Sequence, residues 1–186
     1  MASYFISHPE VVIDPSRPIE TWRLSQSGVL RAGLIASTCW NDKVVQIASS
    51  TETKAVQTAR TVAGAVGMPF IRVAELGEND RSATGFLPSD EFEMVADEFF
   101  AEPDRRVRGW ESARAAQRRI VTAVRTLTTD PLRHTAIIAH GGVGTLLYCD
   151  LSGQPISRRF DQPGQGSWFE FDPTTWSARH GWRRIV

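Results

Sequence analysis

The stretch TAIIAHGGVGTLLYCDL, residues 135–151, carries the clearest fold signal in the sequence. Residues 135–139 form a largely apolar run with the length and composition of a buried strand. They lead directly into His140, Gly141 and Gly142, and residues 143–151 continue as an apolar helix. A strand that passes into a helix through a short connection is the repeating unit of α/β folds.

The same alternation of strand and helix runs through the rest of the chain. Further strands are predicted for residues 3–6, 44–48 and 70–73, and edge strands for residues 168–171 and 182–186. Four more helices are predicted from apolar residues at helical spacing. The first is capped by Ser25 and runs through Val29, Leu30, Leu34 and Ile35, and the second runs from Thr51 or Thr53 to Gly67. The third is capped by Ser89 or Asp90 and runs to Phe100, and the fourth runs from about Ser112 to Leu127. The polar residues 75–87 are predicted to form a long functional loop. We therefore expect one domain over residues 1–186, a three-layer α/β/α sandwich with a mostly parallel central sheet.

Charge and composition argue against several function classes. The chain of 186 residues is 41% hydrophobic, and its 21 basic and 21 acidic residues give no net charge, so no basic patch for nucleic acid or an anionic membrane stands out. The N-terminus lacks the pattern of a signal peptide, and no stretch reaches the roughly 20 apolar residues of a membrane span. We expect a cytoplasmic protein with no nucleic-acid or membrane partner. Cys39 and Cys149 are predicted to be buried free thiols.

Two histidines follow predicted strands by one or two residues. His8 comes after residues 3–6, and His140 comes after residues 135–139. Because ligands of parallel sheets bind where the strands end, both imidazoles are expected at one cleft. A lone histidine is more often structural, but two at equivalent strand ends favour a functional pair. Metal ligation by the pair is less favoured, because no further set of His, Asp or Glu lies at ligand spacing.

A series of short segments shares its order with a known family. The segments are FISHPE (residues 5–10), LSQSG (24–28), SSTETKAVQTA (49–59), LGE (76–78) and AHGGV (139–143). In this order they resemble the signatures of the histidine phosphatase superfamily, also called phosphoglycerate mutase-like. The segment at residues 49–59 is the most specific match, and the closing His-Gly-Gly is intact.

The resemblance implies a role for each matched residue. His8 would attack phosphorus as a neutral imidazole and form a phosphohistidine. His140 would donate hydrogen bonds to the phosphoryl oxygens, and the backbone N–H groups from Gly141 onward would favour the same anion. Glu78 would protonate the leaving oxygen and later take a proton from water. His8, Glu78 and His140 are thus the expected catalytic residues.

The sequence departs from the family at the phosphate pocket. Ser7 and Lys54 stand where the family has two arginines, and both are retained as expected phosphate-binding residues, although neither offers the planar fork of a guanidinium. Asp14 stands where an asparagine is common, and it is expected either to repel the dianion or to cap the turn at Pro15. The basic residues expected to compensate are, in order, Arg81, Arg158 and Arg159.

The resemblance favours a metal-independent phosphatase that acts on a small phosphorylated metabolite without a cofactor, as a monomer or a homo-oligomer. The alternatives are a weakened or inactive phospho-ligand binding protein of the same fold, and a mutase-type phosphotransferase, which is less favoured because the chain is short for the substrate-covering insert of the larger relatives. A cysteine phosphatase is excluded because neither Cys39 nor Cys149 has an arginine shortly after it. Four aromatic residues could line a pocket mouth and select an apolar leaving group: Trp22, Phe86, Trp110 and Trp168.

Overall fold

The structure is a computed structural model that describes residues 2–38, 44–130 and 132–186. In chain order the strands and α-helices are β1 (Ser3–Ser7), α1 (Gln26–Thr38), β2 (Val44–Ser49), α2 (Thr53–Val66), β3 (Ile71–Arg72), α3 (Ser89–Ala101), α4 (Ala113–Leu127), β4 (His134–Ala139), α5 (Gly141–Leu151), β5 (Ser167–Asp172), β6 (Ser177–Ala178) and β7 (Arg183–Arg184). Short 3-10 turns lie between them: η1 (Ile19–Thr21), η2 (Ala74–Leu76), η3 (Val107–Gly109) and η4 (Arg158–Phe160).

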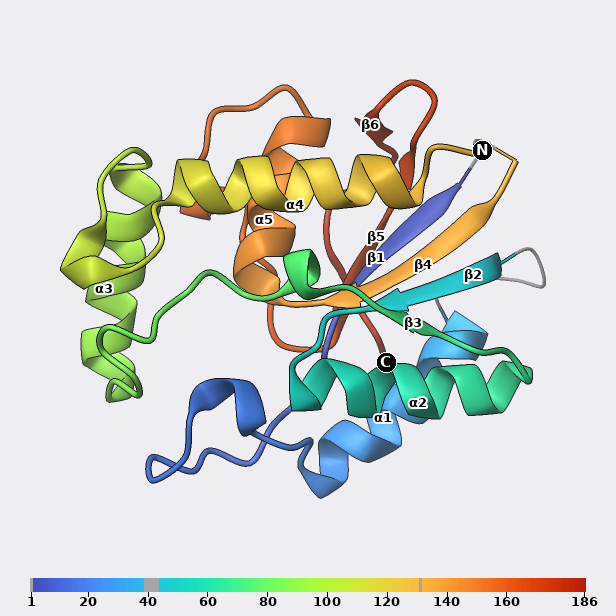
Figure 1. Ribbon diagram of the computed structural model, residues 1–186, viewed down its shortest axis with the longest axis horizontal. Coiled ribbons are helices and arrows are strands. Elements are labelled where there is room, and N and C mark those ends of the chain that lie inside the picture. The colour runs from blue at the N-terminus through green and yellow to red at the C-terminus, as the bar shows by residue number, and fades with distance from the viewer. Residues whose placement is uncertain (1, 39–43, 131) are drawn as a thin grey trace.

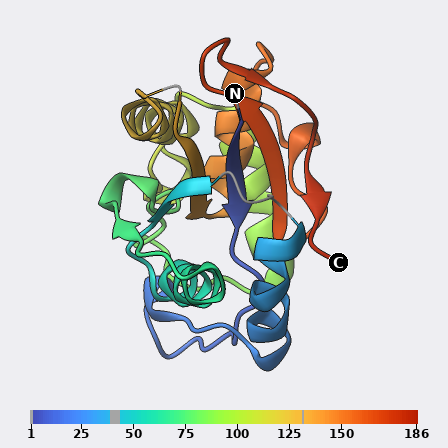
Figure 2. The same ribbon diagram turned by 90° about the vertical axis from the view of Figure 1, so that its right-hand side faces the viewer.

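The strands form one sheet in the order β3-β2-β4-β1-β5-β6, with β7 also paired to β5. The first four strands are parallel, whereas β5 runs antiparallel to β1. Figure 1 shows α1 and α2 below the sheet and α4 and α5 above it, and Figure 2 gives the view at right angles. The mostly parallel sheet between two helical layers confirms the fold predicted from the sequence.

Alternating side chains of the strands divide the core into two clusters. Phe5, Ile137 and Phe169 point to the side of α3, α4 and α5. Their sequence neighbours Ile6 and Ile138 point to the side of α1 and α2. Since successive residues of a strand face opposite ways, a strand that is apolar throughout must be covered on both faces.

The register of β1 and β4 positions the two histidines. Ser7 pairs with Ala139 at the end of the parallel ladder, and the backbone N–H of His8 donates to the carbonyl of Ala139 at 3.0 Å. His8 and His140 are therefore the first residues beyond two adjacent strand ends. Pro9 follows immediately and cannot donate to a ladder, so β1 ends there.

Two predicted helix starts differ in the structure. The expected cap of α3 by Ser89 or Asp90 is wrong, because Pro88 occupies the cap position and no side-chain capping hydrogen bond is formed among the described residues. The carbonyl of Pro88 instead accepts the N–H of Phe92 at 2.8 Å. The last major helix, α5, begins at Gly141 rather than at residue 143.

Of the two expected edge strands, the one at residues 182–186 is confirmed by β7, which pairs with β5 alone, whereas the one at residues 168–171 is not at an edge. β5 lies inside the sheet, because it pairs with β1 on one side and with the two-residue strands β6 and β7 on the other. Antiparallel strands can be joined by short turns, so the chain after β5 folds back onto its free edge.

Burial corrects the apolar face of α1. Val29, Leu30 and Leu34 are exposed, and the buried residues of the helix include Ala32 and Ile35. Cys149 is a buried free thiol, as predicted, while Cys39 lies outside the described residues. No helix in the described part of the chain has the length and apolar character needed to cross a membrane.

Candidate active site

His8 is held as a neutral imidazole with one nitrogen free. Its Nδ1 lies 2.8 Å from the carbonyl oxygen of Pro9, which only accepts, so Nδ1 carries the proton and Nε2 keeps its lone pair. Burial, with a further contribution from the charge of Lys54, lowers the pKa of His8 from 6.5 to about 4. At neutral pH this side chain is an uncharged base with the form of a nucleophile.

His140 lies beside His8 at the adjoining strand end. The two ring centroids are 5.2 Å apart, and the rings meet edge to face at 68°. His140 is fully buried, and its Nε2 lies 2.8 Å from the hydroxyl of Ser50 and 3.3 Å from Oε1 of Glu52. Burial, the largest influence, lowers the pKa of His140 well below its ordinary value. The structure thus brings both predicted histidines into one site as neutral rings.

Glu78 reaches the same site and covers the start of α5. Its Oε2 accepts the backbone N–H of Gly142 at 3.0 Å, and its Oε1 accepts that of Val143 at 2.9 Å. The unpaired N–H groups of a helix N-terminus favour an anion, and here this anion is the carboxylate of the protein itself. Gly142 permits the approach, because a Cβ at this position would lie 2.7 Å from Oε1 of Glu78.

Lys54 is buried and bound to other protein groups. The residue is 3% exposed, and its Nζ donates to the carbonyl of Ile19 at 3.0 Å and to Oε2 of Glu52 at 2.5 Å. Burial favours the neutral form of Glu52, but the neighbouring His140 and Lys54 outweigh it and lower the pKa of Glu52 to about 2. A second carboxylate therefore lies next to the cation that the sequence assigned to phosphate.

The hydroxyl of Ser7 is hydrogen-bonded to residues other than the two histidines. Its hydroxyl donates to Oε1 of Gln162 at 2.5 Å and accepts the backbone N–H of Ser167 at 3.0 Å. The Gln162 side chain also lies over Gly141, where a Cβ would come within 2.1 Å of its Nε2. Gln162 thus occupies the space beside Ser7 and Gly141, the two sequence-predicted phosphate contacts on this side.

The three predicted compensating arginines take different positions. Arg81 lines both cavities of the site described below, and its guanidinium lies 5.2 Å from the ring centroid of Phe92. Arg158 and Arg159 are on η4, and neither is among the described residues that line those cavities. Arg158 is paired with Glu93 and Asp97.

Asp14 makes the turn that was one of its two expected roles. Its Oδ1 accepts the backbone N–H of Ser16 at 3.1 Å and the hydroxyl of the same residue at 2.6 Å. These hydrogen bonds and the nearby Arg17 keep the pKa of Asp14 below its usual value. The carboxylate lines a separate surface depression with Arg17 and Trp22.

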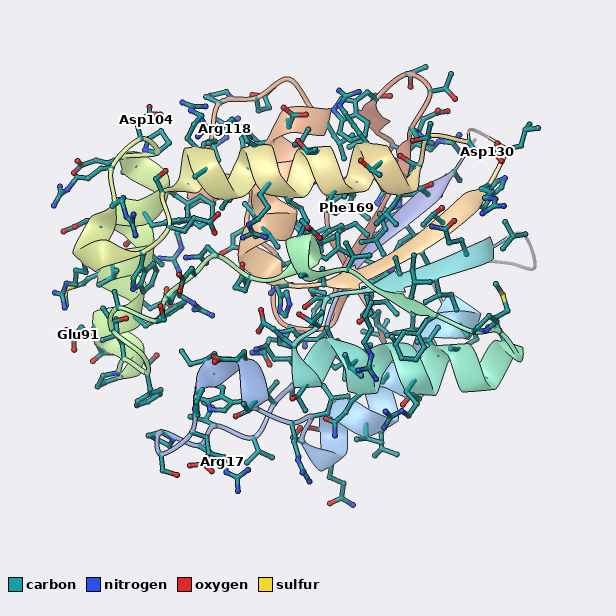
Figure 3. All side chains as sticks on the ribbon, viewed as in Figure 1. Arg17, Glu91, Asp104, Arg118, Asp130 and Phe169 are labelled. Carbon is teal, nitrogen blue, oxygen red and sulfur yellow. The ribbon has the colours of Figure 1, made fainter. Side chains whose placement is uncertain are left out.

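Two adjoining cavities open onto the site. The first, which we call the acidic cavity, has a volume of about 640 Å³ and is lined by Arg17, Glu20, Glu52, Glu78, Asn79, Asp80 and Arg81, among others. Figure 3 labels Arg17 on the loop between β1 and α1 that forms its outer wall. The second, the aromatic cavity, measures about 500 Å³ and is lined by His8, Val11, Ile19, Trp22, Lys54, Arg81, Phe86 and Phe92, among others.

The four aromatic candidates divide between cavity and core. Trp22 and Phe86 line the aromatic cavity, with their ring centroids 6.0 Å apart. Trp110 and Trp168 are buried, 2% and 8% exposed, and belong to the two core clusters. In the described part of the chain, no group of three or more His, Cys, Asp or Glu is arranged to hold a metal ion.

The sequence matches the histidine phosphatase superfamily (branch 1) over residues 19–181. The chain belongs to the histidine phosphatase superfamily. This membership confirms the family and the class of enzyme that the motifs predicted. The matched range includes Lys54, Glu78 and His140 and begins after His8, whose position beside His140 comes from the structure. Among curated proteins there is no match to the sequence.

Solved structures, two phosphatases among them, share the fold at low identity. Mycobacterial glucosyl-3-phosphoglycerate phosphatase is 19% identical, with a TM-score of 0.80 over 100% of this chain and 99% of that chain. Bacillus stearothermophilus YhfR is 22% identical, with a TM-score of 0.74 over 91% and 89% of the two chains. Alpha-ribazole phosphatase from Shigella flexneri is 19% identical, with a TM-score of 0.72 over 100% and 96%. These likenesses establish the fold.

Sequence reasoning missed four side chains of this superfamily member's site: Ser50, Glu52, Asn79 and Gln162. Glu52 carries a readable signal, since it is an acid two residues before Lys54 inside the most specific motif. Asn79 follows Glu78 directly, is 7% exposed, lines the acidic cavity, and its Nδ2 has no hydrogen-bond partner among the described residues. Gln162 has no local signal, because its partner Ser7 is 155 positions away.

Proposed function

We propose that the protein is a metal-independent phosphatase that hydrolyses a small phosphorylated metabolite through a phosphohistidine at His8. The observation that carries the proposal is the state of the His8 imidazole. Its Nδ1 proton is bound to Pro9, its pKa is lowered to about 4, and its ring lies 5.2 Å from that of His140. An uncharged, oriented imidazole is what in-line attack on phosphorus requires.

The remaining residues supply the proton and the positive charge. Nε2 of His8 attacks phosphorus while the bond from phosphorus to the leaving oxygen breaks, and Glu78, which takes up a proton from solvent as the anionic substrate binds, gives that proton to the leaving oxygen. Glu78, ionised again, then takes a proton from the water that cleaves the phosphohistidine, and His8 is regenerated as a neutral ring. Arg81 lines both cavities and supplies the cation at their junction.

The aromatic cavity supports a leaving group with an apolar part. It is lined by His8 at one end and by Trp22 and Phe86 along its wall. A flat apolar group bound in this cavity would bury apolar surface of both rings and of its own. Binding becomes more favourable in proportion to the apolar area that is removed from water. The acidic cavity on the other side suits a polar, neutral or cationic group.

A second candidate function is a phospho-ligand binding protein of the same fold. The observation that favours it is that Lys54 is bound to Glu52 and Ser7 to Gln162, so fewer donors are free for a phosphate than in a pocket with two arginines. The catalytic proposal is preferred because a binding protein has no use for a neutral histidine with a free Nε2.

Turnover without metal separates the two functions. Wild type and His8→Ala are compared with p-nitrophenyl phosphate and a panel of phosphorylated metabolites in the presence of a chelator. The phosphatase proposal expects turnover by wild type and its loss in His8→Ala, together with a phosphohistidine trapped on wild type. Equal turnover in both proteins removes His8 as the nucleophile. Tight binding of phosphate esters without turnover in wild type supports the binding protein instead.

A further inference from the structure

The anion site of this protein contains an acid that the proposed reaction does not use. Glu52 stands at the cap position of α2, and its carboxylate accepts the backbone N–H of Glu78 at 2.8 Å and Nζ of Lys54 at 2.5 Å. The same carboxylate lies 3.3 Å from Nε2 of His140. A phosphoryl group held between His8 and His140 would therefore meet the Glu52 carboxylate at the wall of the acidic cavity.

Most of the positive charge around this carboxylate is already paired with acidic side chains of the protein. Lys54 is paired with Glu52 and Arg119 with Glu111, while Arg81 lines both cavities. His8 and His140 are neutral at physiological pH. The titratable and charged groups that face Glu52 are Lys54 on its own helix, His8 and His140 at the strand ends, Glu78 and Arg81 from the loop after η2, and Arg119 from α4.

Such a site treats the two forms of a phosphate ester differently. The dianion brings two negative charges and only acceptor oxygens against a carboxylate that is itself an acceptor, so the two repel each other. The monoanion carries a P–O–H group, which can donate a charge-assisted hydrogen bond to that carboxylate. A phosphate monoester exchanges its second proton at about pH 6, so both forms are present near neutral pH.

We propose that Glu52 makes the site select singly protonated phosphate, by accepting a hydrogen bond from the protonated phosphoryl oxygen. The inference rests on the proposed function, because it assumes that the phosphoryl group lies between His8 and His140. Glu52 is thus a specificity-determining residue, and the substrate is bound as its monoanion. The same contact excludes sulfate, which has the shape of phosphate but carries no proton in this range.

Binding of methylphosphonate and sulfate tests the inference without any turnover. Methylphosphonate is not hydrolysed, and like a phosphate monoester it carries one P–O–H group as the monoanion and none as the dianion. Dissociation constants are measured by calorimetry between about pH 5.5 and pH 8.5, which lies above the lowered pKa of about 4 of His8. For wild type, methylphosphonate is expected to bind more than about tenfold more tightly than sulfate at the acidic end. Its affinity should fall by about tenfold for each pH unit above its second pKa.

Two variants assign the effect to the carboxylate. Glu52→Gln keeps the size of the side chain but replaces one acceptor oxygen by a donor amide, so it should bind sulfate and the methylphosphonate dianion more tightly and lose most of the pH dependence. Glu98→Gln is the matched control, because Glu98 is exposed on α3 and is not among the described residues that line either cavity, so the variant should behave as wild type. A thermal melt of each protein checks that it is folded.

The inference is overturned by wild type alone if methylphosphonate and sulfate bind equally, if neither binds at any pH, or if methylphosphonate binds more tightly as the pH rises. It is also overturned if Glu52→Gln is folded and discriminates as wild type does. The proposed function is tested separately, by the turnover of wild type and His8→Ala. Hydrolysis together with equal binding of methylphosphonate and sulfate would keep the phosphatase and discard the role of Glu52.

Discussion

The Oε2 atom of Glu78 accepts a hydrogen bond of 3.0 Å from the backbone N–H of Gly142. Glu78 comes from the loop after η2, and Gly142 is in the first turn of α5, so this contact ties the candidate acid to the helix that follows His140. The dipole of α5 holds the carboxylate in place. The absence of a side chain at Gly142 is what leaves room for it.

A methyl group at Gly142 should therefore displace the candidate acid. In Gly142→Ala the new Cβ would lie 2.7 Å from Oε1 of Glu78, which is too close for any contact, so the carboxylate must move. We expect kcat to fall by about tenfold or more, because a shift of about 1 Å in a catalytic group has effects of that order. The measurement is steady-state turnover of p-nitrophenyl phosphate.

Gly64→Ala is the control for that variant. Gly64 lies in α2, and a Cβ there would meet nothing within 4 Å. The control should keep wild-type kcat and gain roughly 0.5 to 1 kcal/mol of stability from the loss of glycine inside a helix. Unchanged kcat in a folded Gly142→Ala would show that the position of Glu78 does not limit the reaction.

The buried state of His8 predicts how stability depends on pH. Its pKa is lowered from 6.5 in the unfolded chain to about 4 in the folded protein, so the unfolded state binds more protons between these values. Stability therefore rises with pH across this window, and acid should lower the free energy of unfolding by about 3 kcal/mol between pH 6.5 and pH 4. The lowered pKa of His140 acts in the same direction.

Urea unfolding at a series of pH values checks this expectation. Glu52 contributes in a different window, because its lowered pKa gives stability that is present above its ordinary pKa of 4.5 and lost as the pH falls toward about 2. His8→Asn should lose its share of the dependence between pH 6.5 and pH 4. If His8→Asn and wild type have the same slope there, His8 is not held neutral by burial.

Local patterns were sufficient to predict the frame of the molecule. The apolar runs before His8 and His140 predict buried strands, and parallel strands end at one edge, so the sequence alone brings the two rings together. The end of α2 was equally readable, since Gly67 takes the left-handed conformation, with φ of 66°, that glycine adopts at helix ends.

Contacts between distant segments could not be read in the same way. The burial of the Lys54 and Glu52 pair depends on the packing of η1 and the loop at Glu78 around the start of α2. The contact of Ser7 with Gln162 joins two residues that are 155 positions apart in the sequence. The sequence motifs therefore predict candidate phosphate contacts, but they do not indicate which other side chains of the protein are hydrogen-bonded to them.

The Ser7 and Gln162 pair predicts that an arginine cannot simply be restored. Ser7 is buried, and Gln162 occupies the space beside its hydroxyl, so Ser7→Arg alone should destabilise the protein rather than raise turnover. Adding Gln162→Ala makes room for the guanidinium. The double variant should then bind inorganic phosphate about tenfold more tightly than Gln162→Ala, because one charge-assisted donor is gained.

Calorimetry with phosphate and thermal melts of the four proteins measure both effects. Gln162→Ala is the reference, since it removes the side chain without adding charge. If Ser7→Arg alone is as stable as wild type and already binds phosphate more tightly, then Gln162 does not block the position.

The wall of the aromatic cavity predicts a preference among leaving groups. Trp22 is fixed by its Nε1, which donates to the carbonyl of Asp14 at 2.9 Å, and it lies beside Phe86 on the wall that includes His8. Trp22→Ala should lower kcat/KM for p-nitrophenyl phosphate by about tenfold, the effect of about 1.4 kcal/mol of lost aromatic contact. For glycerol phosphate, whose leaving group is small and polar, kcat/KM should change little.

The ratio of the two kcat/KM values is the quantity to measure, because a general loss of active protein cancels in it. Phe70→Ala serves as the control: Phe70 packs against the α1 and α2 side of the core and is not among the described residues that line the cavity. Its ratio should equal that of wild type. An unchanged ratio in Trp22→Ala would mean that the leaving group does not enter the aromatic cavity. The leaving group would then lie in the acidic cavity beside Glu78, and Asn79→Ala would be the variant that tests this placement.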